Sequence, residues 1–147
     1  MSRLCTIASL KSFSSRIQHD LSEPYQKGVD KMIAFWGGQV ARVLPDHPDL
    51  IVTPEASDRF MNIPAPQQRQ EYYRVRQNQV RDFWSKIARD NNCLVAYSAC
   101  REMPDGTWRN STQIIDRKGE VVGVYNKNHL VVAENTVHGI LAGKDAP

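Results

Sequence analysis

The stretch Pro48-Asp49-Leu50-Ile51-Val52-Thr53-Pro54-Glu55 contains a short apolar run that is followed directly by a proline and an acidic residue. The segment 50–53 is apolar and β-branched without alternation, which is typical of a strand covered on both faces. Pro54 cannot donate a hydrogen bond to a sheet, so the strand is expected to stop there. Ligands of open α/β sheets bind beyond the carboxyl ends of strands, which makes Glu55 a candidate site residue. A plain capping carboxylate at the start of a loop is the competing interpretation.

Two segments with helical spacing flank this strand. The first covers about residues 23–44, with Pro24 near its start, where a missing N–H costs nothing. The second covers about residues 70–91 and carries an i, i+3, i+4, i+7, i+8 apolar stripe. The proline-containing stretch 60–68 and the serine-rich stretch 11–22 are expected to be loops.

Strand-like runs occupy the start and the second half of the chain. Residues 4–10 form a short apolar run near the N-terminus, and turn signals at 104–106 and 117–119 separate later runs. Those later runs cover residues 93–100, 113–116 and 121–125. The resulting order, β-α-β-α-β-β-β, predicts an α/β fold with a mixed sheet and two helices on one face.

A second polar position follows the strand expected at 121–125. Lys127 lies just past its carboxyl end, where an ammonium group can present a fixed positive charge to an oxyanion. His129 is close by, but a single histidine more often has a structural role. Taken alone, Lys127 would be read as a surface lysine in a loop.

The two polar segments together resemble a known family. The run 48–55 resembles the first signature of the nitrilase, or carbon–nitrogen hydrolase, family, which is a buried strand ending in Pro-Glu. The run Gly123-Val124-Tyr125-Asn126-Lys127-Asn128-His129-Leu130 resembles the second, a strand followed by Tyr-x-Lys-x-His-Leu. Between them, Asn110-Ser111-Thr112 and Gly119-Glu120-Val121 stand where the family has two sheet strands. The resemblance covers nearly the whole chain from about Pro24.

The resemblance implies both a fold and a chemistry. The family fold is an αββα sandwich, of which this chain would form part. Such enzymes attack a small amide, carbamoyl or, less often, nitrile carbon with a cysteine thiolate. Glu55 would be the general base, Lys127 would stabilise the tetrahedral oxyanion, and Glu134 would orient the lysine or the substrate. An exposed loop carboxylate is the competing interpretation of Glu134. We expect no metal and no organic cofactor. Members of the family commonly form homo-oligomers, and the resemblance implies the same here.

The chain departs from the family in its cysteines. The third family signature places the nucleophile in a turn after a later strand, which would start beyond Pro147. Cys5 falls on the expected first strand, whereas Cys93 and Cys100 both precede Lys127. We therefore expect residues 1–147 to be a single incomplete carbon–nitrogen hydrolase domain that does not hydrolyse amides by itself, with open apolar strand edges.

Composition sets the remaining expectations. The chain has 147 residues, 41% of them hydrophobic and 24% charged, with a net charge of +3, as in a single globular domain. No apolar run is long enough for a membrane span or a signal peptide, so we expect a cytoplasmic protein. One alternative is a nucleic-acid-binding module using the arginines of segment 69–89 together with Tyr72 and Tyr73; we favour a solvated helix face instead. A scaffold or oligomerisation module is a further alternative.

Overall fold

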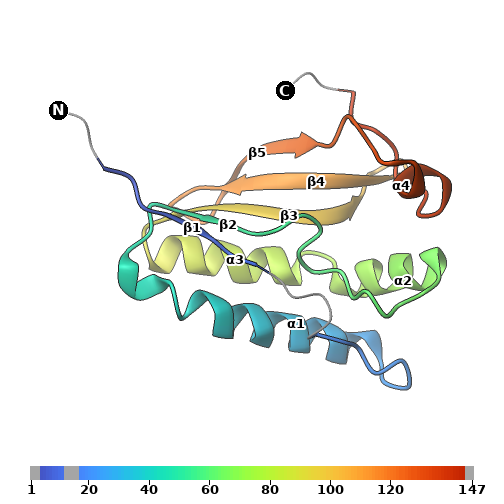
Figure 1. Ribbon diagram of the computed structural model, residues 1–147, viewed down its shortest axis with the longest axis horizontal. Helices are drawn as coiled ribbons and strands as arrows, with labels where there is room; N and C mark the ends of the chain where they lie inside the picture. Colours follow the sequence, from blue (N-terminus) through green and yellow to red (C-terminus); the bar gives the residue numbers. More distant parts are fainter. Residues whose placement is uncertain (1–3, 12–16, 145–147) are drawn as a thin grey trace.

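The computed structural model describes residues 4–11 and 17–144, and its centre is a mixed five-stranded sheet in the order β1-β2-β3-β4-β5 (Figure 1). The first three strands are mutually parallel, and β3, β4 and β5 are antiparallel neighbours. The α/β fold with a mixed sheet, predicted from the sequence, is thereby confirmed. The strands are β1 (Ile7–Ser9), β2 (Leu50–Val52), β3 (Leu94–Glu102), β4 (Trp108–Ile115) and β5 (Val121–Asn126).

The longer helices lie together on one side of this sheet (Figure 1). A short helix, α4, lies at the end of the sheet towards which β3 and β5 run. No helix among the described residues is both long and apolar enough to cross a membrane. The helices are α1 (Tyr25–Val40), a 3₁₀ turn (Leu44–Asp46), α2 (Pro66–Arg76), α3 (Gln79–Asp90) and α4 (Val132–Thr136).

The core forms where α1 and α3 pack on the sheet. Trp36 of α1 and Trp84 of α3 are both fully buried, and their ring centroids lie 5.8 Å apart. Beneath them, Ile51 of β2 and Val95 of β3 are register partners with no exposed surface. Paired positions of neighbouring strands point to the same face, so these two residues form the helix-facing floor of the core.

The helical region differs from the sequence expectation in three ways. The first helix ends at Val40, and residues 44–46 form a 3₁₀ turn because Pro45 cannot continue an α-helix. The second expected helix is two helices, broken at Gln77, whose φ of 45° lies in the left-handed region. Its first part begins at Pro66, inside the stretch expected to be a loop, with the proline in the first helical turn.

Three other segments also differ from the expectation. β4 begins at Trp108, five residues before the run expected to be a strand. Cys5 precedes β1 and does not lie on it. The C-terminal stretch, which has no clear periodicity, contains α4. The expected loop at 11–22 falls partly outside the described residues.

The two edge strands are poorly covered. Val122 and Val124 of β5 are 62% and 46% exposed, and Ile7 of β1 is 59% exposed. By contrast, Tyr72 and Tyr73 of α2 are 1% and 7% exposed, so their rings are not available to stack on nucleic-acid bases. The exposed apolar surface of the described residues thus includes sheet edges, where a further strand can add by backbone pairing.

We expect Gly119→Ala to destabilise the fold by roughly 2–4 kcal/mol, because it adds a steric contact to a left-handed backbone. Gly119 has a φ of 84°, and a Cβ there would lie 2.7 Å from the carbonyl oxygen of Ser85. Gly106 also has positive φ, 77°, but a Cβ there meets nothing within 4 Å, so Gly106→Ala should cost only about 1 kcal/mol. Urea denaturation measures both variants, and equal losses would show that the contact with Ser85 is not made.

Candidate active site

The turn that carries Glu55 is anchored on both sides to β3. Before the turn, the N–H of Thr53 donates to a β3 carbonyl at 3.0 Å. After it, Ser57 donates both its N–H and its hydroxyl to the carbonyl of Ser98, at 2.9 and 2.8 Å. Between the anchors, Ala56 has a φ of 45°, which is unusual for a residue with a Cβ. The turn is therefore tightly fixed, and it holds Glu55 at the carboxyl end of β2.

The backbone of Lys127 is fixed in a similar way at the end of β5. Its N–H donates to the carbonyl of Asn110 on β4 at 2.8 Å, and its own carbonyl accepts from the N–H of Gly143 at 2.9 Å. Only glycine fits at position 143, since a Cβ there would lie 2.3 Å from the carbonyl oxygen of Asn126. The returning C-terminal segment thus packs directly against the strand end that presents Lys127.

Three charged side chains meet between these two anchored segments. The Nζ of Lys127 lies 2.7 Å from Glu55 Oε1 and 2.9 Å from Glu134 Oε2. The side-chain amide of Asn110 donates to Glu55 Oε1 and to Glu134 Oε1, both at 2.7 Å. All three residues predicted from the sequence are therefore brought together, and Asn110 bridges the two carboxylates.

Glu134 is the buried member of this cluster. The residue is 7% exposed, so it is not the exposed loop carboxylate of the competing interpretation. It lies in the first turn of α4, where its Oε2 also accepts from the N–H of Val131 at 3.0 Å. Burial acts to raise the pKa of Glu134, but the hydrogen bonds from Lys127, Asn110 and Val131 outweigh it and leave this pKa below its ordinary value.

Glu55 and Lys127 are more accessible than Glu134. The side chain of Glu55 is 62% exposed and that of Lys127 is 27% exposed. The hydrogen bonds to Glu55 and Glu134 raise the pKa of Lys127 above its ordinary value, so this side chain is an ammonium ion at neutral pH. The cluster therefore presents the exposed carboxylate of Glu55 beside the ammonium of Lys127, which the buried Glu134 holds in position.

Asn110 is the site residue that sequence reasoning did not identify. The family resemblance places the run Asn110-Ser111-Thr112 on a strand but implies no role for the Asn110 amide. The structure shows Asn110 and Ser111 as two adjacent polar residues that are buried within β4. Buried polar side chains require partners, and such partners are commonly found at sites.

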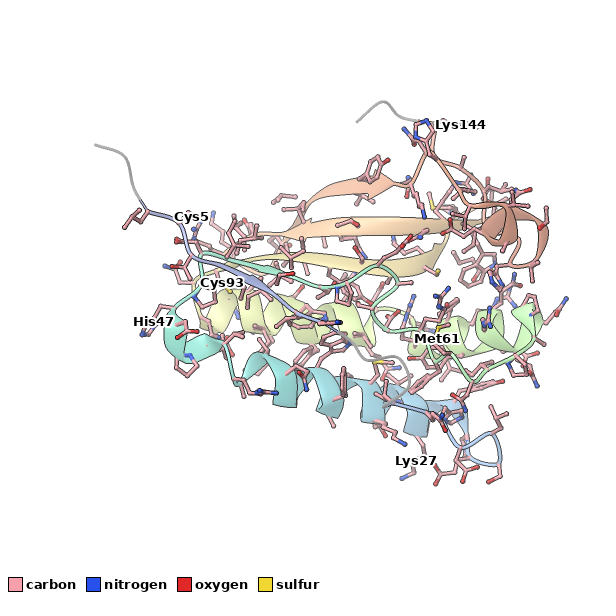
Figure 2. The ribbon with its side chains drawn as sticks, viewed as in Figure 1. Cys5, Lys27, His47, Met61, Cys93 and Lys144 are labelled. Atoms are coloured by element: carbon pink, nitrogen blue, oxygen red, sulfur yellow. The ribbon has the colours of Figure 1, made fainter. Side chains whose placement is uncertain are left out.

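None of the three cysteines lies in the charged cluster. Cys93 is fully buried before β3, and Figure 2 places Cys93 and Cys5 towards the end of the sheet opposite α4. Cys100 is the cross-strand partner of Asn110, yet it is only 2% exposed. Burial raises the pKa of the Cys93 and Cys100 thiols, which disfavours the nucleophilic thiolate. Within the described residues, no group of three His, Cys, Asp or Glu side chains could hold a metal ion.

Comparison with known proteins points to one family. Residues 23–142 match the sequence model of the family described as carbon-nitrogen hydrolase. No curated protein matches the chain in sequence.

Solved structures resemble the chain in fold. An amidase from Nesterenkonia sp. has a TM-score of 0.69 and 21% identity, covering 97% of this chain and 49% of that one. A carbon-nitrogen hydrolase from Helicobacter pylori G27 has a TM-score of 0.64 and 16% identity, covering 95% and 45%. An N-terminal amidase has a TM-score of 0.65 and 16% identity, covering 78% and 28%. The chain thus spans about half or less of the length of these structures, and at such identities the likeness is one of fold.

We expect Lys127→Met to lower the free energy of unfolding by about 1–2 kcal/mol at neutral pH, because it leaves the buried Glu134 without its cation. The lowered pKa of Glu134 means that this contribution is present above the unfolded value of 4.5 and disappears as the pH falls below it. The raised pKa of Lys127 means that it also fades as the pH rises above 10.5.

Urea denaturation of both proteins between pH 3 and pH 11 measures this difference. Lys27→Met, on the exposed face of α1, is the matched control, and its effect should stay small and flat in acid. A Lys127→Met deficit that persists unchanged at pH 3 would show that the ion pair with Glu134 is not what stabilises the fold.

Proposed function

The chain belongs to the carbon–nitrogen hydrolase family, whose sequence model covers residues 23–142, and we propose that it carries the general base and the oxyanion-binding cation of an amide hydrolase. The observation that carries this proposal is the position of Lys127 Nζ, 2.7 Å from Glu55 and 2.9 Å from Glu134. A carboxylate and an ammonium in direct contact at the carboxyl ends of two strands supply a base and an electrostatic stabiliser side by side.

In the proposed reaction, Glu55 takes the proton of a cysteine thiol. Its exposed carboxylate can reach an incoming group, whereas the buried carboxylate of Glu134 cannot. The resulting thiolate attacks the amide carbon, and the carbonyl oxygen becomes an oxyanion that Lys127 stabilises. Collapse of this intermediate breaks the C–N bond, and the proton held by Glu55 passes to the leaving amine. Water then hydrolyses the thioester, with Glu55 first accepting the proton of water and then returning it to the thiol.

Glu134 and Asn110 are positioning residues in this proposal. Glu134 accepts from Lys127, and Asn110 donates to both carboxylates, so neither needs to touch the substrate. Their role is to hold the ammonium and the exposed carboxylate at a fixed separation before the substrate arrives. Such preorganisation lowers the barrier because no reorganisation is needed as charge develops.

A small linear amide is the proposed substrate class. Structures of the Nesterenkonia amidase include one in complex with butyramide and one with the result of Michael addition of acrylamide at the active site cysteine. The amidase neighbours support amide-type hydrolysis over nitrile hydrolysis. We further propose that the protein forms a homo-oligomer, which the exposed apolar residues of β1 and β5 support.

We propose that the nucleophilic cysteine comes from polypeptide outside these 147 residues. Cys93 and Cys100 are buried. Cys5 precedes β1, at the end of the sheet opposite α4 (Figure 2), so none of the three thiols is presented to Glu55. A binding or oligomerisation module of the same fold is the alternative, and the exposed strand edges favour it if no such cysteine is supplied.

We expect the 147-residue chain alone to release no ammonia from butyramide above the uncatalysed rate. The intact mass of the natural gene product shows whether translation continues past Pro147 into a cysteine-bearing segment. In a protein that has this segment, Glu55→Gln and Lys127→Met should each lower kcat/KM for butyramide by about 10³-fold or more, because one removes the base and the other the oxyanion stabiliser.

Two exposed residues near the β4–β5 turn provide matched controls. Glu120→Gln and Lys118→Met make the same changes of charge away from the cluster and should leave kcat/KM within about twofold of the wild-type value. Turnover by the 147-residue chain that survives Glu55→Gln would contradict the proposed base. If the natural gene product ends at Pro147 and is inactive, the result would favour the binding or oligomerisation module over the enzyme.

A further inference from the structure

A cavity lies apart from the Glu55–Lys127–Glu134 cluster. It has a volume of about 760 Å³ and lies between the α2–α3 junction, the β3–β4 hairpin and part of the sheet, and none of the three cluster residues lines it. Its volume falls within the range of sites for small organic ligands and exceeds that of a bare ion. The cavity is basic, because four arginines and one glutamate line it: Arg74, Arg76, Arg81, Arg101 and Glu102.

Three of the four arginines have carboxylate partners. Arg76 is almost fully buried and forms an ion pair with Asp58 at 2.8 Å. Arg74 donates two hydrogen bonds to Glu102 Oε1, at 3.1 and 2.8 Å. Arg81 lies 2.6 Å from Asp82, its neighbour on α3. These pairs neutralise most of the positive charge of the cavity wall.

Arg101 is the exception. Within the described residues, no carboxylate or carbonyl accepts a hydrogen bond from its guanidinium, although the residue is partly buried. The charged groups that act on it most strongly are Arg81 and Arg76, both of its own sign. Partial burial, together with these two cations, lowers the pKa of Arg101. A partly buried cation that faces other cations and has no acceptor among the described residues is free to bind an anion, which would offset the repulsion from Arg76 and Arg81.

The backbone at the mouth of the cavity is strained. Gln77 lines the cavity and combines a φ of 45° with a ψ of −120°, a conformation that residues with a Cβ rarely adopt. This strained residue separates α2 from α3, and without it Arg81 would lie on the same continuous helix as Arg74. Strained backbone is often retained where it shapes a site.

We propose that this cavity binds a small organic molecule through an oxyanion group, a phosphate or a carboxylate, with Arg101 as its main contact. A guanidinium presents two parallel N–H groups to such an anion, which matches the geometry of both groups. Because Arg76, Arg74 and Arg81 are already paired, the anion compensates the one cation that remains. The site is distinct from the proposed catalytic cluster and does not depend on amide hydrolysis.

The test is a calorimetric titration of the full chain with inorganic phosphate and, separately, with succinate, at an ionic strength held constant with sodium chloride. We expect saturable binding of at least one probe. The Arg101→Gln variant should weaken this binding at least tenfold, because it removes the unpaired guanidinium. Arg89→Gln, on the exposed end of α3, removes the same charge outside the cavity and should change the affinity less than twofold.

Each outcome bears on the proposal. Phosphate binding without succinate binding assigns a phosphate ligand, and the reverse assigns a carboxylate ligand. Absence of saturable binding by both probes, or an Arg101→Gln variant that binds as tightly as the wild type, overturns the proposal. Free of ligand, Arg101→Gln should melt at or above the wild-type Tm, since it relieves repulsion from Arg76 and Arg81.

A second measurement uses the wild-type protein, so it tests the proposal even if the Arg101→Gln variant does not fold. Phenylglyoxal modifies accessible guanidinium groups, and mass spectrometry identifies the arginines that react. We expect the bound probe to protect Arg101 at least fivefold while leaving the labelling of Arg89 unchanged. Equal labelling of Arg101 with and without the saturating probe would overturn the assignment of Arg101 as the main contact.

Discussion

The buried ion pair between Asp58 and Arg76 connects the two candidate sites of this structure, the charged cluster and the basic cavity. Their carboxylate and guanidinium lie 2.8 Å apart, with side chains 0% and 5% exposed, and Arg76 also donates to the carbonyl of Cys100 at 2.7 Å. Asp58 belongs to the turn that carries Glu55, whereas Arg76 is the last residue of α2. The pair thus ties the proposed catalytic turn to the helix end that borders the basic cavity. Loss of one partner would leave a buried charge, which typically costs about 3–5 kcal/mol.

The positions of Glu55 and Lys127 could be predicted from the sequence because both follow strands, whereas their roles, and the choice of Glu134, came from the resemblance to the family. Glu55 and Lys127 each come directly after an apolar run, and carboxyl ends of parallel strands meet at one edge of a sheet. The role of Asn110 could not be predicted, since it depends on a side chain reaching two carboxylates from separate segments. The burial of Glu134 could not be predicted from the sequence either, because α4 has only five residues and is too short to show a helical periodicity.

The mixed sheet and the layer of helices on one face also followed from the order of the apolar runs. The break between α2 and α3 did not, because Gln77 adopts a left-handed conformation that glycine or asparagine usually marks. The early start of β4 was missed for a different reason. Arg109, Asn110 and Ser111 interrupt the apolar pattern, and of these Asn110 donates to the carboxylates of Glu55 and Glu134. Local patterns therefore failed where tertiary contacts determine the backbone.

The charge of the cluster explains why one lysine is held by two carboxylates. Glu55, Glu134 and Lys127 together carry one net negative charge, so the ammonium is attracted from both sides. In the proposed reaction, transfer of the thiol proton to Glu55 leaves this carboxyl neutral and weakens its hold on Lys127. The ammonium is then free to turn its N–H groups towards the oxyanion while Glu134 still fixes its position. Two carboxylates thus allow one to act as a base without releasing the lysine, which a single carboxylate could not achieve.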